Sequence, residues 1–181
     1  EQWETRMRRA ITRLRATRAF GAPGRGRLHV GALVLPCALG PAGVRRAKRE
    51  GDGATPAGRF RLLEAFWRAD RTPRPATRLR LTAIRPGDLW CDDPRAALYN
   101  RPARAPLRDG CEKMARDDRL YDVVVVLDHN QRPRVRGFGS AIFFHVAREG
   151  FPPTQGCVAV APEAMRRVLP LLARRATMSI D

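Results

Sequence analysis

The run Val123-Val124-Val125-Val126 constrains the fold more than any other stretch of this chain. β-branched residues favour strands, and the segment 123–127 has no polar residue at any position. A strand without alternation is covered by apolar side chains on both of its faces. The sequence therefore predicts a central buried strand, after which the segment 129–133 turns the chain.

Most other apolar runs are short and end at glycine or proline, which is typical of strands and turns. They predict further strands at 28–35, which Pro36 closes, at 60–67, at 79–84, in a run ending at His145, and at 177–180. One helix is expected late in the chain, because Pro162 and Glu163 suit a helix N-terminus. Its apolar face would be Met165, Val168, Leu169 and Leu172, with a kink at Pro170. The fold class is therefore mostly β, with few short helices.

The N-terminal region permits two interpretations. One is a short amphipathic helix at residues 3–14, because helical spacing is shown by Trp3, Met7, Ile11 and Leu14. The other is a strand at about residues 10–18. A Gly/Pro loop is expected at 22–26. We divide the chain into an N-terminal extension or first element, residues 1–26, and a single domain, residues 27–181.

The composition limits the possible partners. The formal net charge is +17, nearly all of it from arginine, and such a protein is attracted to polyanions. A coding bias toward Arg, Ala, Gly and Pro explains the charge equally well. Zinc-finger spacing and RNA-binding aromatic motifs are absent from the sequence, so we do not expect nucleic acid as a partner. No apolar run approaches the roughly 20 residues of a membrane span.

The segment from His145 to Cys157 carries the residues with the clearest chemical use. A thiol is mostly protonated at neutral pH, since its free pKa is about 8.5, and an imidazole base can remove its proton. Gly156 permits a tight turn, so the backbone amides of Gly156 and Cys157 are candidates for an oxyanion hole. Taken singly, His145 and Cys157 each also fit a buried structural residue. Thr154 and Gln155, which precede Gly156 and Cys157, are predicted to contact substrate.

The other cysteines are Cys37, Cys91 and Cys111. No pair has the C-x-x-C spacing, so a structural zinc site is not expected, and we predict no metal and no organic cofactor. At most one disulfide can form among these three if Cys157 is a free nucleophile. The preferred interpretation of each is a small buried apolar residue.

Two upstream segments are also distinctive. Thr55-Pro56-Ala57-Gly58 has good turn chemistry before the strand at 60–67. The segment 88–101 combines three carboxylates with Trp90, Tyr99 and Asn100 in a loop-like setting. These three residues are candidates for a substrate-facing wall, and the alternative is an irregular surface loop anchored by Trp90 and Tyr99.

Together, His145 and Thr154-Gln155-Gly156-Cys157 resemble the signature of the YkuD-type L,D-transpeptidases. The segment Thr55-Pro56-Ala57-Gly58-Arg59-Phe60 is similar to a second element of that family. Gln155 stands where the family often has histidine, and the loop after His145 is short. The Trp-x-Asp-Asp-Pro and Tyr-Asn patterns at 90–94 and 99–100 look like those of small proteins with the same short loop, a variant of Alpha- and Betaproteobacteria.

The resemblance implies a YkuD-like β-sandwich and a peptidoglycan L,D-transpeptidase. In such an enzyme Cys157 attacks a stem-peptide carbonyl, forms an acyl-thioester and passes the acyl group to the diaminopimelate amine of a second stem. The product is a 1-3 or 3-3 cross-link, with a lean to 1-3. The expected location is the periplasm or cell envelope, and the expected state is a monomer. Two alternatives stay open: an L,D-carboxypeptidase or amidase, and a non-enzymatic polyanion-binding module.

Overall fold

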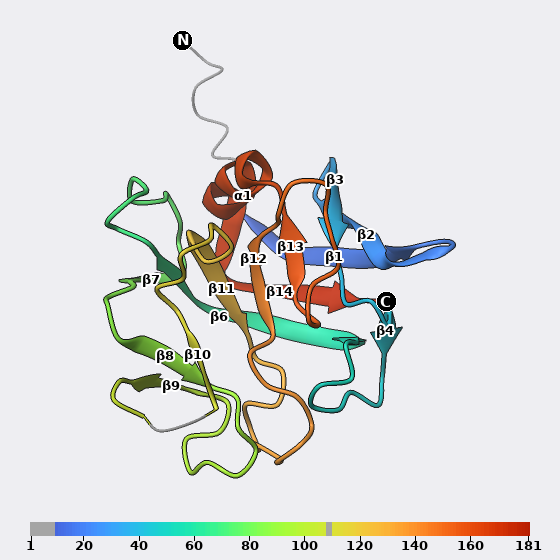
Figure 1. Cartoon of the computed structure of the whole chain (residues 1–181). Helices are drawn as coiled ribbons and strands as arrows, with labels where there is room; N and C mark the ends of the chain where they lie inside the picture. Colours follow the sequence, from blue (N-terminus) through green and yellow to red (C-terminus); the bar gives the residue numbers. More distant parts are fainter. Residues whose placement is uncertain (1–9, 108–109) are drawn as a thin grey trace.

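The structure, a computed structural model, describes residues 10–107 and 110–181 and is mostly β, as predicted (Figure 1). In chain order the elements are β1 (Ile11–Ala19), β2 (Ala22–Val30), β3 (Leu33–Ala38), β4 (Val44–Arg45), β5 (Thr55–Pro56), β6 (Gly58–Trp67), β7 (Arg80–Ala83), β8 (Asp88–Cys91), β9 (Arg101–Arg104), β10 (Cys111–Lys113), β11 (Val123–Leu127), β12 (Phe143–Val146), β13 (Val158–Val160), α1 (Pro162–Val168), the 3-10 helix η1 (Leu169–Leu171) and β14 (Leu172–Ile180).

The main sheet has the strand order β11-β12-β13-β3-β2-β1-β14-β6-β7. Because β6 pairs with β11 as well as with β14, the strand order returns on itself. Within the described residues, a separate three-stranded sheet, β10-β8-β9, lies beside the main sheet in Figure 1, and β4 and β5 form a short parallel pair.

The central strand predicted from the valine run is β11, and all five of its residues are buried. Val123, Val125 and Leu127 belong to the main hydrophobic core. Val124 and Val126 belong to a second cluster on the other face, together with Phe143 and Cys157. The prediction of a strand covered on both faces is therefore confirmed, and the second cluster brings it next to the predicted nucleophile.

The predicted late helix is α1, with Pro162 in its first turn and Glu163 near its N-terminus. Its buried residues Met165 and Val168 pack into the main core. Pro170 does not kink this helix, because α1 ends at Val168 and Pro170 lies in η1. The last strand, β14, is longer than the predicted segment 177–180, while β6 and β7 match the strands predicted at 60–67 and 79–84.

The N-terminal predictions need correction. The helix over 3–14 is wrong where the structure describes it, since Ile11 and Leu14 lie in β1, which agrees with the alternative strand over 10–18. Trp3 and Met7 lie outside the described residues. Pairing with β2 and β14 fixes this extended conformation and outweighs the helical spacing.

The segments 22–26 and 28–35 also differ from expectation. The predicted loop is the first half of β2, and the predicted single strand is the end of β2, a turn at Gly31, and β3. Pro36 lies inside β3, opposite Arg27, and does not end it. On its other side β3 pairs with β13 at Ala38, so Pro36 lies along a largely open edge, where its missing N–H is tolerated.

The division of the chain at residue 26 stays a prediction. β2 itself runs across that position, from Ala22 to Val30.

Candidate active site

His145 lies in β12, and Cys157 directly precedes the adjacent parallel strand β13. In the register of β12 with β13, His145 lies opposite Ala159 and Phe144 lies opposite Val158. Cys157 precedes β13 and lies two residues before Ala159, so it projects from the same face as His145. The alternate residues Phe144, Val146, Val158 and Val160 point into the main core. The backbone ladder therefore brings the two predicted residues together, and we call them the pocket floor.

Two backbone groups hold the Cys157 thiol. Its Sγ donates to the carbonyl of Ala141 at 3.2 Å and accepts from the amide of Phe143 at 3.3 Å. Ala141 has the left-handed φ of 51°, and its own N–H donates to Asn100 Oδ1 at 3.1 Å. Burial raises the pKa of Cys157 to about 12, which the Phe143 amide opposes. The resting sulfur is therefore a neutral thiol.

His145 is oriented by its own strand. Nδ1 lies 2.8 Å from the carbonyl of Val146. Because a carbonyl only accepts, Nδ1 carries the proton and Nε2 keeps its lone pair. The ring also packs edge-on against Tyr121, with centroids 5.5 Å apart. Burial lowers the pKa of His145 to about 4, so the imidazole is neutral at pH 7 and can act as a base.

The turn before Cys157 is closed by Thr154. Its Oγ1 donates to the Cys157 carbonyl at 2.7 Å and accepts from the Gly156 amide at 3.1 Å. An acyl oxygen would compete with this hydroxyl for the Gly156 amide, so the oxyanion role of Gly156 stays a prediction. Gln155 is exposed beside the turn and lines the pocket.

The upstream threonine motif packs against this same turn. Gly156 has a φ of 124°, and a Cβ at this position would lie 2.7 Å from the carbonyl oxygen of Ala54. Thr55 is buried, and its Oγ1 accepts from the Gly40 amide at 2.8 Å. The two motifs, about a hundred residues apart in the sequence, therefore form one structural unit in which position 156 has room only for glycine.

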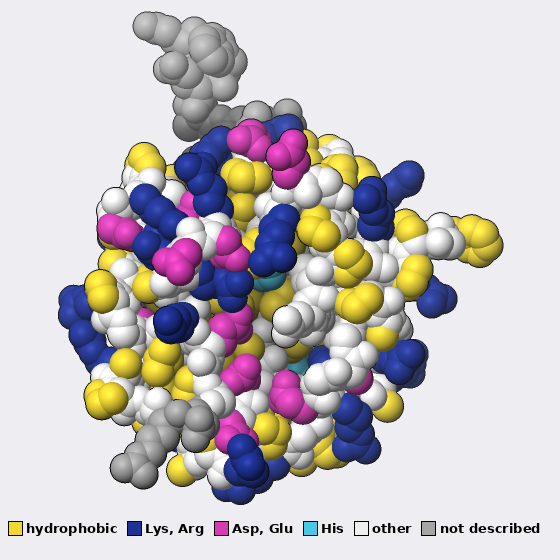
Figure 2. Space-filling view, viewed as in Figure 1, with side chains coloured by type: hydrophobic (Ala, Val, Ile, Leu, Met, Phe, Trp, Pro, Cys, Tyr) yellow, Lys and Arg dark blue, Asp and Glu magenta, His cyan; other side chains and the backbone are white. Residues whose placement is uncertain are grey.

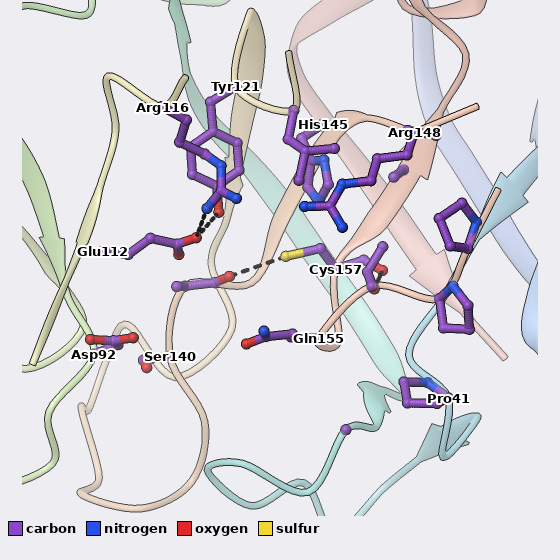
Figure 3. A pocket seen from close by; sticks show the side chains of 18 of the residues that line it. Pro41, Asp92, Glu112, Arg116, Tyr121, Ser140, His145, Arg148, Gln155 and Cys157 are labelled. Atoms are coloured by element: carbon purple, nitrogen blue, oxygen red, sulfur yellow. Dashed lines mark hydrogen bonds and ion pairs between the residues drawn. The ribbon is translucent and has the colours of Figure 1, made fainter. Parts of the chain in front are cut away.

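A pocket of about 510 Å³ opens over the pocket floor. It is lined by His145, Cys157, Ala159, Thr154 and Gln155, and by charged residues that the sequence analysis did not single out (Figure 3). Although the chain is strongly basic, Figure 2 shows acidic side chains gathered toward the centre of this face. Three of the pocket-lining residues are the carboxylates Glu50, Asp92 and Glu112.

One side of the pocket, which we call the pocket wall, is formed by Glu112, Arg116 and Tyr121. Glu112 Oε1 accepts from the Tyr121 hydroxyl at 2.7 Å and from Arg116 at 3.0 Å (Figure 3). Burial raises the pKa of Glu112, and the Tyr121 hydrogen bond and Arg116 oppose the rise. Arg116 also binds Asp118 with two nitrogens at 2.8 Å.

The pocket wall was missed because its residues are scattered over 112–121 and match no motif. The one available signal was a set of charged residues in the segment directly before a fully buried strand. Segments that connect strands commonly carry functional residues.

Trp90, Tyr99 and Asn100 are all buried. The Trp90 indole N–H donates to Asn100 Oδ1 at 3.1 Å, and the Tyr99 hydroxyl donates to Glu50 at 2.5 Å. Asn100 also donates to the carbonyls of His129 and Asn130. These side chains support the segment that carries Ala141, and contact between them and substrate stays a prediction that these bonds do not favour.

Among residues 10–107 and 110–181, no three His, Cys, Asp or Glu side chains are grouped so as to hold a metal ion. In the same ranges, no helix has the length and apolar character needed to cross a membrane.

The fold and site define a β-rich domain with a buried thiol and a neutral imidazole facing one pocket, as acyl transfer through cysteine requires. Residues 24–180 match the family model of the YkuD L,D-transpeptidase catalytic domain. The chain therefore belongs to the YkuD L,D-transpeptidase family. No curated protein and no solved structure gave a significant match to it.

Proposed function

We propose that the protein is a peptidoglycan L,D-transpeptidase with Cys157 as nucleophile and His145 as general base. The observation that carries the proposal is that both side chains project from one face of two paired strands into the same pocket. The family supports the reaction class, and peptidoglycan stem peptides are the substrate. Work on such a substrate implies the periplasm or cell envelope as the location.

The protonation states favour proton transfer during attack over a preformed ion pair. A thiol with a pKa near 12 and an imidazole with a pKa near 4 are both neutral at pH 7. As the sulfur approaches the stem-peptide carbonyl carbon, His145 Nε2 takes its proton. The Phe143 amide, which already donates to Sγ, stabilises the negative charge that develops there.

The proton that His145 takes from Cys157 is used in the remaining steps. The tetrahedral oxyanion is held by backbone amides, for which Cys157 and Gly156 are the candidates. Collapse breaks the peptide bond, and His145 returns its proton to the leaving amine, so that an acyl-thioester remains on Cys157. The neutral diaminopimelate amine of a second stem then attacks the thioester and gives a proton to His145. The C–S bond breaks, His145 returns the proton to the leaving Cys157 sulfur, and a new peptide cross-link is released.

The bond attacked joins an L centre to a D centre. In a diaminopimelate stem, attack after residue one gives a 1-3 cross-link, and attack after residue three gives a 3-3 cross-link. We favour 1-3, because the short loop between His145 and Thr154 is similar to that of variants associated with such links.

Mass spectrometry of purified muropeptides incubated with the protein tests the proposal. We expect dimers from the intact protein and none from Cys157→Ala, and fragmentation identifies the link. Cys37→Ala is the matched control, because burial also raises the pKa of Cys37 to about 12 but its side chain lies in the main core. That variant should keep the activity.

Two other outcomes would replace the proposal. Shortened monomers without dimers would indicate an L,D-carboxypeptidase or amidase that uses the same thiol. The second outcome is that no product depends on Cys157, while binding to nucleic acid is salt-sensitive and survives Cys157→Ala. The protein would then be a polyanion-binding module that uses its net charge of +17.

A further inference from the structure

Two cysteines outside the pocket floor lie directly opposite each other in the three-stranded sheet. β8 and β10 are antiparallel, and Cys91 pairs with Cys111. The amide of Asp92 donates to the carbonyl of Gly110 at 3.0 Å, which places the cysteine pair between ladder hydrogen bonds. At such a non-hydrogen-bonded position the two Cα atoms are about 4.5 Å apart and the side chains are at their closest.

The two thiols already interact. Burial first, and then the hydrogen bond with Cys91, raise the pKa of Cys111 to about 11. Cys91 is buried, whereas Cys111 is partly exposed. Disulfides need Cα atoms roughly 4.4–6.8 Å apart, so this pair can be bridged without moving either strand.

We propose that Cys91 and Cys111 form a cross-strand disulfide when the protein meets an oxidant that carries a disulfide bond. This modification goes beyond the proposed reaction and uses neither His145 nor Cys157. It joins β8, which carries Trp90, to β10, which carries the pocket-wall residue Glu112.

The chemistry is thiol–disulfide exchange. The more accessible Cys111, as its thiolate, attacks one sulfur of glutathione disulfide and releases one glutathione thiol, which leaves a mixed disulfide. Cys91 then loses its proton and attacks the Cys111 sulfur, which forms the intramolecular bond and releases the second glutathione. Two protein thiols are oxidised, one glutathione disulfide is reduced, and the two thiol protons end on the two glutathiones.

The remaining cysteines cannot substitute for this pair. Cys37 lies in β3 and belongs to the main core, and Cys157 belongs to the pocket floor. Because exchange requires sulfurs in contact, only the cross-strand pair can close without unfolding.

Equilibration of the full chain with reduced and oxidised glutathione, followed by alkylation and peptide mapping, tests the proposal. We expect one linked peptide pair containing Cys91 and Cys111, a mass about 2 Da below that of the reduced protein, and alkylated Cys37. The melting temperature should rise by roughly 5–10 °C over the reduced form, since the bond restricts the unfolded chain.

Variants separate this pair from the other thiols. Cys91→Ala and Cys111→Ala should each lose the linked peptide and the rise in melting temperature, whereas Cys37→Ala and Cys157→Ala should keep both. A fully alkylated wild-type chain, or a glutathione adduct that persists on Cys111, would overturn the proposal. No peptidoglycan is used, so this outcome and that of the transpeptidase assay are independent.

Discussion

The pocket floor and the pocket wall meet in one cavity but are built in opposite ways. On the floor, backbone groups hold both reactive side chains: Ala141 and Phe143 hold the Cys157 sulfur, and Val146 holds His145. On the wall, charged side chains hold one another, from Glu112 to Arg116. The floor is neutral at rest and the wall is charged. This contrast suggests that the floor sets reactivity and the wall sets which substrate binds.

The largest expected effect is from His145→Gln, which removes the base from the floor. We expect kcat/KM to fall by about 10²–10⁴-fold, the usual contribution of general base catalysis. The release of cross-linked dimers over time, followed by mass spectrometry, measures it.

His29→Gln is the matched control, since His29 lies in β2 and does not line the pocket. Equal losses in the two variants would show that the effect is structural, and a loss below threefold in His145→Gln would remove His145 from the mechanism.

Asn100→Ala tests whether the support behind the floor matters. It removes the partner of the Trp90 indole, of the Ala141 amide and of two carbonyls, all at a buried position. Because such groups then lack partners, unfolding free energy should fall by about 2–4 kcal/mol, as denaturant titration measures.

Asn100→Asp sharpens this test, because it keeps an acceptor for Trp90 and Ala141 and suits the left-handed φ of 54° at this position. It loses the donor and places a carboxyl oxygen against the two carbonyls. Activity retained in Asn100→Asp but lost in Asn100→Ala would trace the effect to the acceptor that Trp90 and Ala141 share. An unchanged stability in Asn100→Ala would contradict the supporting role.

Glu112→Gln changes the charge of the wall with little change in shape. The amide oxygen still accepts from Tyr121, but the negative charge beside Arg116 is gone. We expect KM for the stem-peptide amine to rise about threefold to tenfold, with kcat changed less than twofold, because a nearby carboxylate attracts a cationic amine.

The control is Glu64→Gln, which removes a carboxylate paired with Arg80 at 3.7 Å, outside the pocket. Steady-state kinetics at several acceptor concentrations separates KM from kcat. An effect on kcat alone would show that Glu112 acts in the reaction of His145 and Cys157, and not in binding of the acceptor.

The smallest expected effect is that of pH between 5 and 7. The active form has neutral His145, and burial lowers its pKa to about 4. The neutral fraction therefore stays nearly full down to about pH 5, and kcat/KM for the donor stem, which reports acylation and not the acceptor amine, should change less than about twofold over this range. The acid limb should appear as pH falls through about 4. A limb near the unperturbed value of about 6.5 would mean that the imidazole is solvated.

The free energy of unfolding should also depend on the protonation of His145, and it should fall as pH falls. The unfolded imidazole binds a proton below about pH 6.5, while folded His145 does not until about pH 4. The stabilisation is therefore complete above pH 6.5 and is lost as pH falls below it.

The floor could be predicted from the sequence, because His145 and the turn Thr154–Cys157 lie next to apolar runs whose pairing brings them together. The buried strand β11 and the helix α1 were predictable for the same reason, since pattern and end signals agree there. The wall could not be predicted. Glu112 reaches the pocket because β10 pairs with β8, and three-residue strands have too few residues to show a periodicity.

The N-terminal errors have a related cause. Residues 22–26 look like a loop by composition, yet β2 is held on both sides, by β1 and β3. Pairing with the two neighbouring strands therefore outweighs the loop propensity of these residues. Trp90 and Tyr99 are candidates either for a substrate-facing wall or for anchors of their segment. Their polar atoms bind Asn100 and Glu50, which favours the anchoring role, and their contact with substrate stays a prediction.

The parallel pairing of β12 with β13 has one more consequence. The ladder pairs His145 with Ala159, two residues after Cys157, and the amide of Ala147 extends it to Val160. We therefore expect that the segment 148–153 can be exchanged: its length and side chains could be redesigned to admit other acyl donors while the two reacting groups keep their positions.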